Sequence, residues 1–187
     1  PTEATVTTTP TITAVYDKGK GAVVVVATES IDGNGKVLFR GQSSIFVRGE
    51  GGFGGDRGPS GAQNVPPDRK PDTSISYKTL PQQALIYRLS GDMNPLHADP
   101  DFAKMGGFDV PILHGLCTFG HAGRAVLATY CDNDPSRLKT FAVRFSGVVF
   151  PGETITTDMW KVDDHTIVFT ARTERGEALS SAAATIA

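Results

Sequence analysis

The sequence has few cysteines, no long apolar run and no excess of either charge. Only Cys117 and Cys131 occur among 187 residues, without a CxxC pair or zinc-finger spacing, which favours a reducing compartment over a disulfide scaffold. No apolar run approaches the roughly 20 residues of a membrane-spanning helix. Eighteen Lys and Arg against 20 Asp and Glu leave a net charge of −2. We therefore expect neither nucleic acid nor a membrane surface as a partner.

The first third of the chain is patterned for strands. Residues 11–48 hold two apolar runs around the turn sequence "DGNG", which predicts a hairpin. The next segment, Gly49 to Asp72, is rich in Gly, Pro and charge. Such a composition does not build a core, so this segment is predicted to connect two parts of the chain.

The pattern changes from Thr79 onward. A Thr cap, an early Pro and a Gly stop predict a short helix over residues 80–90. Residues 114–130 carry apolar side chains at helical spacing and predict one long, mostly buried helix. After Pro135 four further segments read as strands. A long helix followed by four strands indicates an α+β fold, in which a curled antiparallel sheet wraps around that helix.

Between the two predicted helices lies an unusual loop, "YRLSGDMNPLHADPDF", from Tyr87 to Phe102. Between Gly91 and Pro100 it holds two carboxylates, an Asn and a His, flanked by a glycine and two prolines. A helix or strand is not built from such residues, so the loop is a candidate for chemistry.

This loop, together with "GFDVPILHGLCTFG" and "RFSGVVFPGE", closely resembles the (R)-specific 2-enoyl-CoA hydratases, the MaoC-like or type 2 hydratases. The earlier "DKGKGAVVVV", "GGFGG" and "PPD" resemble the second half of the N-terminal hot dog in the two-hot-dog members of that family. The resemblance spans nearly the whole chain. It implies a hot-dog fold, fatty acid metabolism such as beta-oxidation, acyl-CoA substrates and no cofactor beyond the coenzyme A of the substrate.

Hydration of an enoyl thioester requires a base for water, an acid for C2 and a donor for the thioester oxygen. Asp92 and His97 suit the first two roles, because Pro95 stiffens a non-helical path that turns both side chains toward one point. The resemblance implies that they share one water and that the product is the (3R)-hydroxyacyl thioester. It assigns Asn94 to support of the pair. Gly115 opens the long helix, so its N–H is the expected oxyanion donor.

The expected substrate contacts rest on matched family positions. Lys18 lies near the bound thioester ligand in the family, and a Lys can meet a phosphate. Phe145 matches a strand position beside the pantetheine tunnel, and Arg144 on the opposite side of that strand is a weaker candidate for the nucleotide phosphates. The loop residues Gly91, Met93, Pro95 and Leu96 complete the expected substrate-binding set.

Other interpretations of these residues stay open. A single Asp after a helix-ending Gly is often a turn residue, and a single His is often structural. His114 suits a cap or a structural hydrogen bond, and His121 and His165 have structural interpretations. A metal site would be assembled from Asp92, His97, Asp99 and Asp109, but the spacing matches no standard ligand pattern and no metal is expected. Asp99 and Asp101 fit turns and caps, and Cys117 should be an inert core residue.

Three functions compete. An enoyl-CoA hydratase leads, a dehydratase of acyl-carrier-protein thioesters would use the same pair, and a silent hot-dog subunit would only shape the acyl pocket of a partner. Hot-dog thioesterases lack the "GDxNPLH" loop.

The expected domains are the strand part of an incomplete N-terminal hot dog over 1–52, a linker over 53–72 and a catalytic C-terminal hot dog over 73–187. The first of these lacks a helix to cover its sheet, so the remainder of that hot dog comes from an upstream segment or a partner chain. We expect a homodimer. The absence of a secretion signal favours the cytoplasm, or the peroxisome if the chain is an excised domain of a larger enzyme, although no peroxisomal signal ends this sequence.

Overall fold

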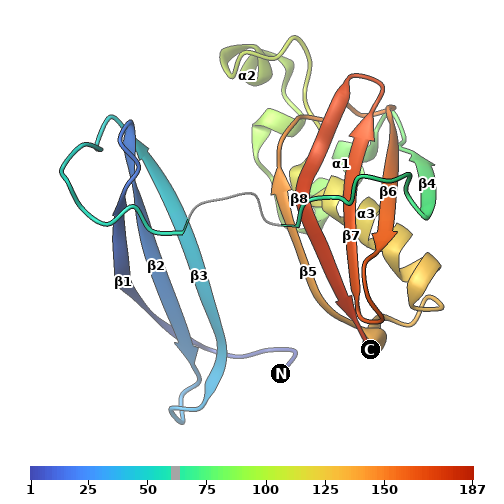
Figure 1. Cartoon of the computed structure of the whole chain (residues 1–187). Helices are drawn as coiled ribbons and strands as arrows, with labels where there is room; N and C mark the ends of the chain where they lie inside the picture. The colour runs from blue at the N-terminus through green and yellow to red at the C-terminus, as the bar shows by residue number, and fades with distance from the viewer. Residues whose placement is uncertain (60–63) are drawn as a thin grey trace. The chain divides into compact units, whose positions relative to one another are not determined.

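The computed structural model describes residues 1–59 and 64–187, and the chain divides into two compact units, Pro1–Gly61 and Ala62–Ala187. Figure 1 shows strands in the first unit, and strands with helices in the second. Each unit has its own sheet. No helix among the described residues is long and apolar enough to cross a membrane.

The first unit is a three-stranded antiparallel sheet in the order β1-β2-β3. Its strands are β1 (Thr7–Asp17), β2 (Gly21–Ile31) and β3 (Val37–Arg48). The turn between β2 and β3 lies at the predicted hairpin, where an Asp32 carboxylate oxygen accepts from the N–H groups of Asn34 and Lys36 at 2.9 and 3.0 Å. The sequence analysis treated β1 and β2 as one apolar run. They are separate because a second turn at Gly19, with φ +78°, divides them.

The segment after β3 folds back onto this sheet. The buried carboxylate of Asp17 accepts hydrogen bonds from the N–H groups of Gly19, Gly52 and Gly54 at 2.7–2.8 Å. These bonds lower the pKa of Asp17, because they stabilise its charged form. The start of the segment expected to be a linker therefore belongs to the first unit, and residues 60–63 of it lie outside the described residues.

The second unit is a five-stranded antiparallel sheet with the order β4-β6-β7-β8-β5. Helix α3 (Gly115–Tyr130) packs against this sheet, as Figure 1 shows. The strands are β4 (Thr73–Lys78), β5 (Leu138–Phe145), β6 (Thr154–Lys161), β7 (Thr166–Thr173) and β8 (Gly176–Ile186). The four strands predicted after Pro135 are confirmed. Strand β4 was missed, because its sequence "TSISYK" has only two apolar residues and depends on pairing with β6.

Helix α3 forms the inner layer of this unit. It buries Cys117, Ala122, Ala125 and Val126, which pack in one core with side chains from all the inner strands. The predicted helix is confirmed, with His114 as its N-cap residue. The expectation that it is mostly buried fails at Leu116, which is 54% exposed because it lies on the face away from the sheet.

Five short helices complete the described part of this unit, residues 64–187. They are α1 (Gln83–Tyr87), η1 (Arg88–Ser90), η2 (Pro95–His97), α2 (Pro100–Met105) and η3 (Pro135–Arg137). Thr79 does not cap α1 as predicted, because its hydroxyl donates to the Glu153 carbonyl and accepts from the Gly152 N–H, both at 2.8 Å. The Asp99 carboxylate does cap α2, as predicted, by accepting from the N–H groups of Asp101 and Phe102.

Candidate active site

The loop from Gly91 to His97 is shaped mainly by its own sequence. Gly91 ends η1 with φ +114°, a conformation that glycine adopts without a steric penalty. An Asp92 carboxylate oxygen accepts from the Asn94 N–H at 3.2 Å, and the Asn94 amide oxygen caps η2 by accepting from the Leu96 N–H at 3.0 Å. Asn94 therefore supports the backbone between Asp92 and His97.

One contact shows which nitrogen of the neutral His97 ring carries the hydrogen. Its Nδ1 lies 2.8 Å from the carbonyl oxygen of Ile112, fifteen residues along the chain. Because a carbonyl oxygen only accepts, Nδ1 carries the hydrogen and the neutral ring keeps its lone pair on Nε2. Nε2 is therefore the atom of His97 that can take a proton.

His114 lies directly behind His97. The two rings stack with centroids 3.8 Å apart and planes 28° from parallel. His114 is 1% exposed, and its Nε2 lies 3.1 Å from the main-chain oxygen of Asp92. Burial lowers the pKa of His114, although the bond to the Asp92 carbonyl acts in the opposite direction. Burial therefore favours the neutral form of the ring.

Asp92, His97 and His114 form one cluster of titratable groups, with a ligand-type atom of each within 4.8 Å of the others. Side chains of these types can bind a metal ion. His97 Nδ1 and His114 Nε2 each bond to a main-chain carbonyl oxygen, so neither of these nitrogens has a lone pair free for an ion. Asp99, the third ligand considered from sequence, uses its carboxylate to cap α2. The ring nitrogens that keep a lone pair are His97 Nε2 and His114 Nδ1.

The start of α3 supplies hydrogen-bond donors beside this cluster. The N–H groups of Cys117 and Thr118 bond to the His114 carbonyl, whereas that of Gly115 has no acceptor among the described residues. Gly115 and His97 line a common cavity of about 170 Å³, together with Phe145. The Phe145 ring lies 3.0 Å from the position of a Cβ on Gly115, so any larger residue would press on it.

A second cavity borders His97 on an apolar side. Its volume is about 280 Å³. The lining residues besides His97 come from α1 and the residue Pro81 before it, from the end of η2, and from the segments before α3 and after β5. They are Pro81, Ala84, Leu85, Ala98, Val110, Pro111, Phe150 and Pro151. These residues were not predicted as a group. The three prolines at 81, 111 and 151 are the only signal in the sequence that could have pointed to them, because proline makes the backbone rigid.

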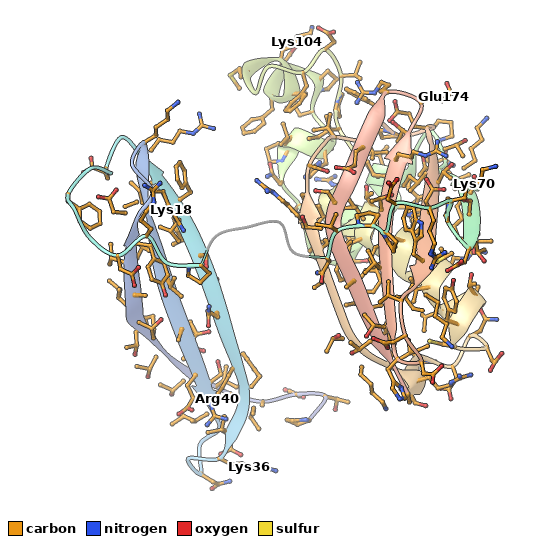
Figure 2. The ribbon with its side chains drawn as sticks, in the orientation of Figure 1. Lys18, Lys36, Arg40, Lys70, Lys104 and Glu174 are labelled. Atoms are coloured by element: carbon orange, nitrogen blue, oxygen red, sulfur yellow. The ribbon has the colours of Figure 1, made fainter. Side chains whose placement is uncertain are left out.

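The other predicted substrate contacts come from several elements. Lys18, labelled in Figure 2, lies in the turn between β1 and β2 of the first unit, where its ammonium donates to the main-chain oxygens of Arg57 and Pro59. Arg144 and Met93 are exposed, and Pro95 and Leu96 form part of η2. The structure thus brings together Asp92, His97, Gly115 and Phe145.

Comparison with known proteins shows which families the chain matches. Residues 62–183 match the family model described as the MaoC like domain, and residues 1–49 match the MFE-2 hydratase 2 N-terminal domain. A probable enoyl-CoA hydratase 2 of Dictyostelium discoideum is 52% identical over 178 residues, which are 94% of this chain and 60% of that protein.

Solved structures agree on the fold. The full-length peroxisomal multifunctional enzyme type 2 from Drosophila melanogaster matches with a TM-score of 0.82 and 45% identity, over 100% of this chain and 34% of that one. A MaoC-like dehydratase from Phytophthora capsici matches with a TM-score of 0.84 and 40% identity, over 98% of this chain and 65% of that one. The chain thus spans less than two thirds of each of these relatives. Its fold is a hot dog, with a sheet around helix α3, and the chain belongs to the MaoC-like domain family.

Proposed function

We propose that the protein catalyses the reversible hydration of trans-2-enoyl-CoA to (3R)-3-hydroxyacyl-CoA. The observation that carries the proposal is the placement of Asp92 and His97 in one cluster, with His97 sharing a cavity with Gly115. Two proton-transfer groups beside a free N–H at a helix start meet the needs of this reaction. The names of the relatives, enoyl-CoA hydratase 2 and multifunctional enzyme type 2, agree with the proposal.

In the proposed mechanism, Asp92 and His97 hold one water between them. The water oxygen forms a bond to C3 of the substrate, and one member of the pair takes the proton that the water releases. The electrons of the C2–C3 double bond move toward the thioester oxygen. The pair then passes the proton taken from the water to C2 as the electrons return from that oxygen, so both members end in their starting states. The lone pair on His97 Nε2 fits this member for accepting the water proton.

The Gly115 N–H is the proposed donor to the thioester oxygen. It lies at the first residue of a 16-residue helix, where the free N–H groups and the helix dipole both favour negative charge. The charge on this oxygen grows as the C3–O bond forms, so the interaction strengthens in the transition state. Phe145 and the wall of the smaller cavity would exclude bulk water from the reacting atoms.

A longer chain or a partner is proposed to complete the first unit. The register places Val15, Val24 and Ile45 in one cross-strand row, and two of them, Val15 and Ile45, are about half exposed. Isolated small sheets need an apolar cover to be stable. We assign that cover to a further segment of the same protein, since its relatives are longer than this chain.

Activity tests the proposal directly. The protein is expected to consume trans-2-enoyl-CoA, with loss of the conjugated enoyl absorbance, equally well with and without a chelator. The same acyl group on acyl carrier protein should be a poorer substrate. Activity on the carrier-protein thioester alone would favour the dehydratase alternative, and activity restored only by a divalent ion would contradict the proposed mechanism.

A further inference from the structure

His114 contacts both members of the proposed pair and precedes the proposed oxyanion donor. Its Nε2 bonds to the main chain of Asp92, its ring stacks on His97, and Gly115 follows it in the chain. The side chain makes no capping hydrogen bond to helix α3. We infer that His114 is a positioning residue that orients Asp92 and His97, an inference that rests on the proposed function.

The first contact fixes the loop at the residue that carries the carboxylate. A carbonyl oxygen accepts, so His114 donates its Nε2 hydrogen to the Asp92 oxygen at 3.1 Å. The loop around it is exposed from Gly91 to Pro95. In the part of the chain that the structure describes, the Asp92 carboxylate bonds only to the nearby Asn94 N–H. The buried imidazole therefore ties an exposed loop to the start of α3. Without this bond, the distance between the Asp92 carboxylate and the His97 ring would no longer be fixed.

The second contact fixes the plane of the His97 ring. The bond from Nδ1 to the Ile112 carbonyl restrains one edge of that ring, and the stack on His114 restrains its face. Together these two contacts fix the direction in which the lone pair on His97 Nε2 points. His114 is itself held by burial and by the Tyr87 ring, 4.8 Å away at 50°.

The third feature is the charge of His114. Its buried Nδ1 has no partner among the described residues, so a hydrogen on this nitrogen would have no acceptor. The neutral form, with the hydrogen on Nε2 alone, is therefore favoured where the ring touches His97. A neutral ring face stabilises the imidazolium that forms on His97 when it takes a proton, whereas a second cation would oppose it.

Two substitutions separate the two contacts. His114→Phe keeps an aromatic ring for the stack and removes the donor to Asp92. His114→Gln keeps a donor near the Nε2 position and removes the stack. Each should lower kcat about 10- to 100-fold, because small displacements of reacting groups have effects of this size, and KM should stay within about threefold.

A sharper test makes the same substitutions in proteins that already lack one member of the proposed pair. If His114→Phe acts through Asp92, it should cost less than about threefold in an Asp92→Asn protein. His114→Gln should likewise cost little in a His97→Gln protein. Equal losses in every background would overturn the inference, as would loss of folding in both single variants. His121→Phe is the matched control, since His121 lies in the same helix and bonds only within it.

Nitrogen-15 NMR of the imidazoles provides a readout without substrate. The chain has four histidines, so the His97 signals can be assigned by substitution. We expect the parent to hold His97 with its hydrogen on Nδ1, and His114→Gln to give a mixture of both tautomers. An unchanged His97 tautomer in His114→Gln, combined with a normal kcat, would overturn the positioning role. Absence of hydratase activity in the parent would instead contradict the proposed function and leave this NMR test in force.

Discussion

The Phe145 ring occupies the space that a Cβ atom on Gly115 would need, with two ring carbons 3.0 and 3.1 Å from that position. These two residues come from helix α3 and strand β5, and they meet at the smaller cavity beside His97. Because Gly115 has no side chain, the Phe145 ring can occupy its position and the free Gly115 N–H stays accessible.

Gly115→Ala is expected to lower kcat/KM by about 10- to 100-fold, because the added methyl group displaces the ring or shields the N–H donor. Gly120→Ala is the control, since nothing lies within 4 Å of its Cβ position. That substitution should leave the activity unchanged and raise the free energy of unfolding by up to about 1 kcal/mol. Steady-state kinetics and thermal unfolding check both. A partial rescue of Gly115→Ala by Phe145→Leu would identify the ring contact as the cause.

Asp92→Asn and His97→Gln test the proton-transfer pair. Each should lower kcat by at least about 10²-fold, and the double substitution should cost little more than the worse single one, because the two groups act on one water. Asn retains the oxygen that accepts from the Asn94 N–H, so the free energy of unfolding should change by no more than about 1 kcal/mol. Turnover within a few-fold of the parent in His97→Gln, or its unfolding, would show that His97 is only structural.

The pH dependence of the first unit should follow Asp17. The folded pKa of this group is lowered, so its contribution to stability is present above the unfolded pKa of about 3.9 and is lost as the pH falls below it. Asp17→Asn should lower the unfolding temperature at neutral pH and flatten its decline in acid. Asp56→Asn, in the same loop, is the matched control. Parallel pH curves for Asp17→Asn and the parent would contradict the role of the three glycine N–H bonds.

Both thiols should be inert in the folded protein. Burial raises the pKa of Cys117 to about 11, and burial also raises that of Cys131. Only a minute fraction of Cys117 is thiolate at neutral pH, so a thiol-specific reagent should modify neither residue until denaturant is added. Rapid modification of the native protein with loss of activity would show that Cys117 is accessible and would contradict this description of the core.

The sequence predicts those elements of the second unit whose regularly spaced apolar residues are also the residues that face the core. Helix α3 and the strands after Pro135 carry apolar residues at a regular period, and those periods match the faces that pack together. Strand β4 escapes prediction because it is polar and short, and its pairing with β6 spans about eighty residues. Thr79 was assigned to the wrong role because its partners, Gly152 and Glu153, are equally distant in the chain.

The same distinction holds at the candidate site. The closeness of Asp92 and His97 follows from five residues of sequence with an Asx-type bond and a proline between them. The tautomer of His97 depends on a carbonyl group fifteen residues away in the sequence. The stack with His114 depends on how the start of helix α3 packs. Contacts of this kind leave no local signal, because they are set only when distant segments pack. The substrate residues predicted from the resemblance, such as Lys18 and Arg144, stay predictions.

The stereochemistry of the product is the most direct test of the proposed activity. The protein should be incubated with trans-2-enoyl-CoA in the presence of a chelator, and the 3-hydroxyacyl product should be resolved on a chiral column. The account predicts the (3R) product, formed by the parent and by Gly120→Ala, and strongly reduced in Asp92→Asn and His97→Gln. A (3S) product, or a (3R) product formed equally fast by the two pair variants, would contradict it.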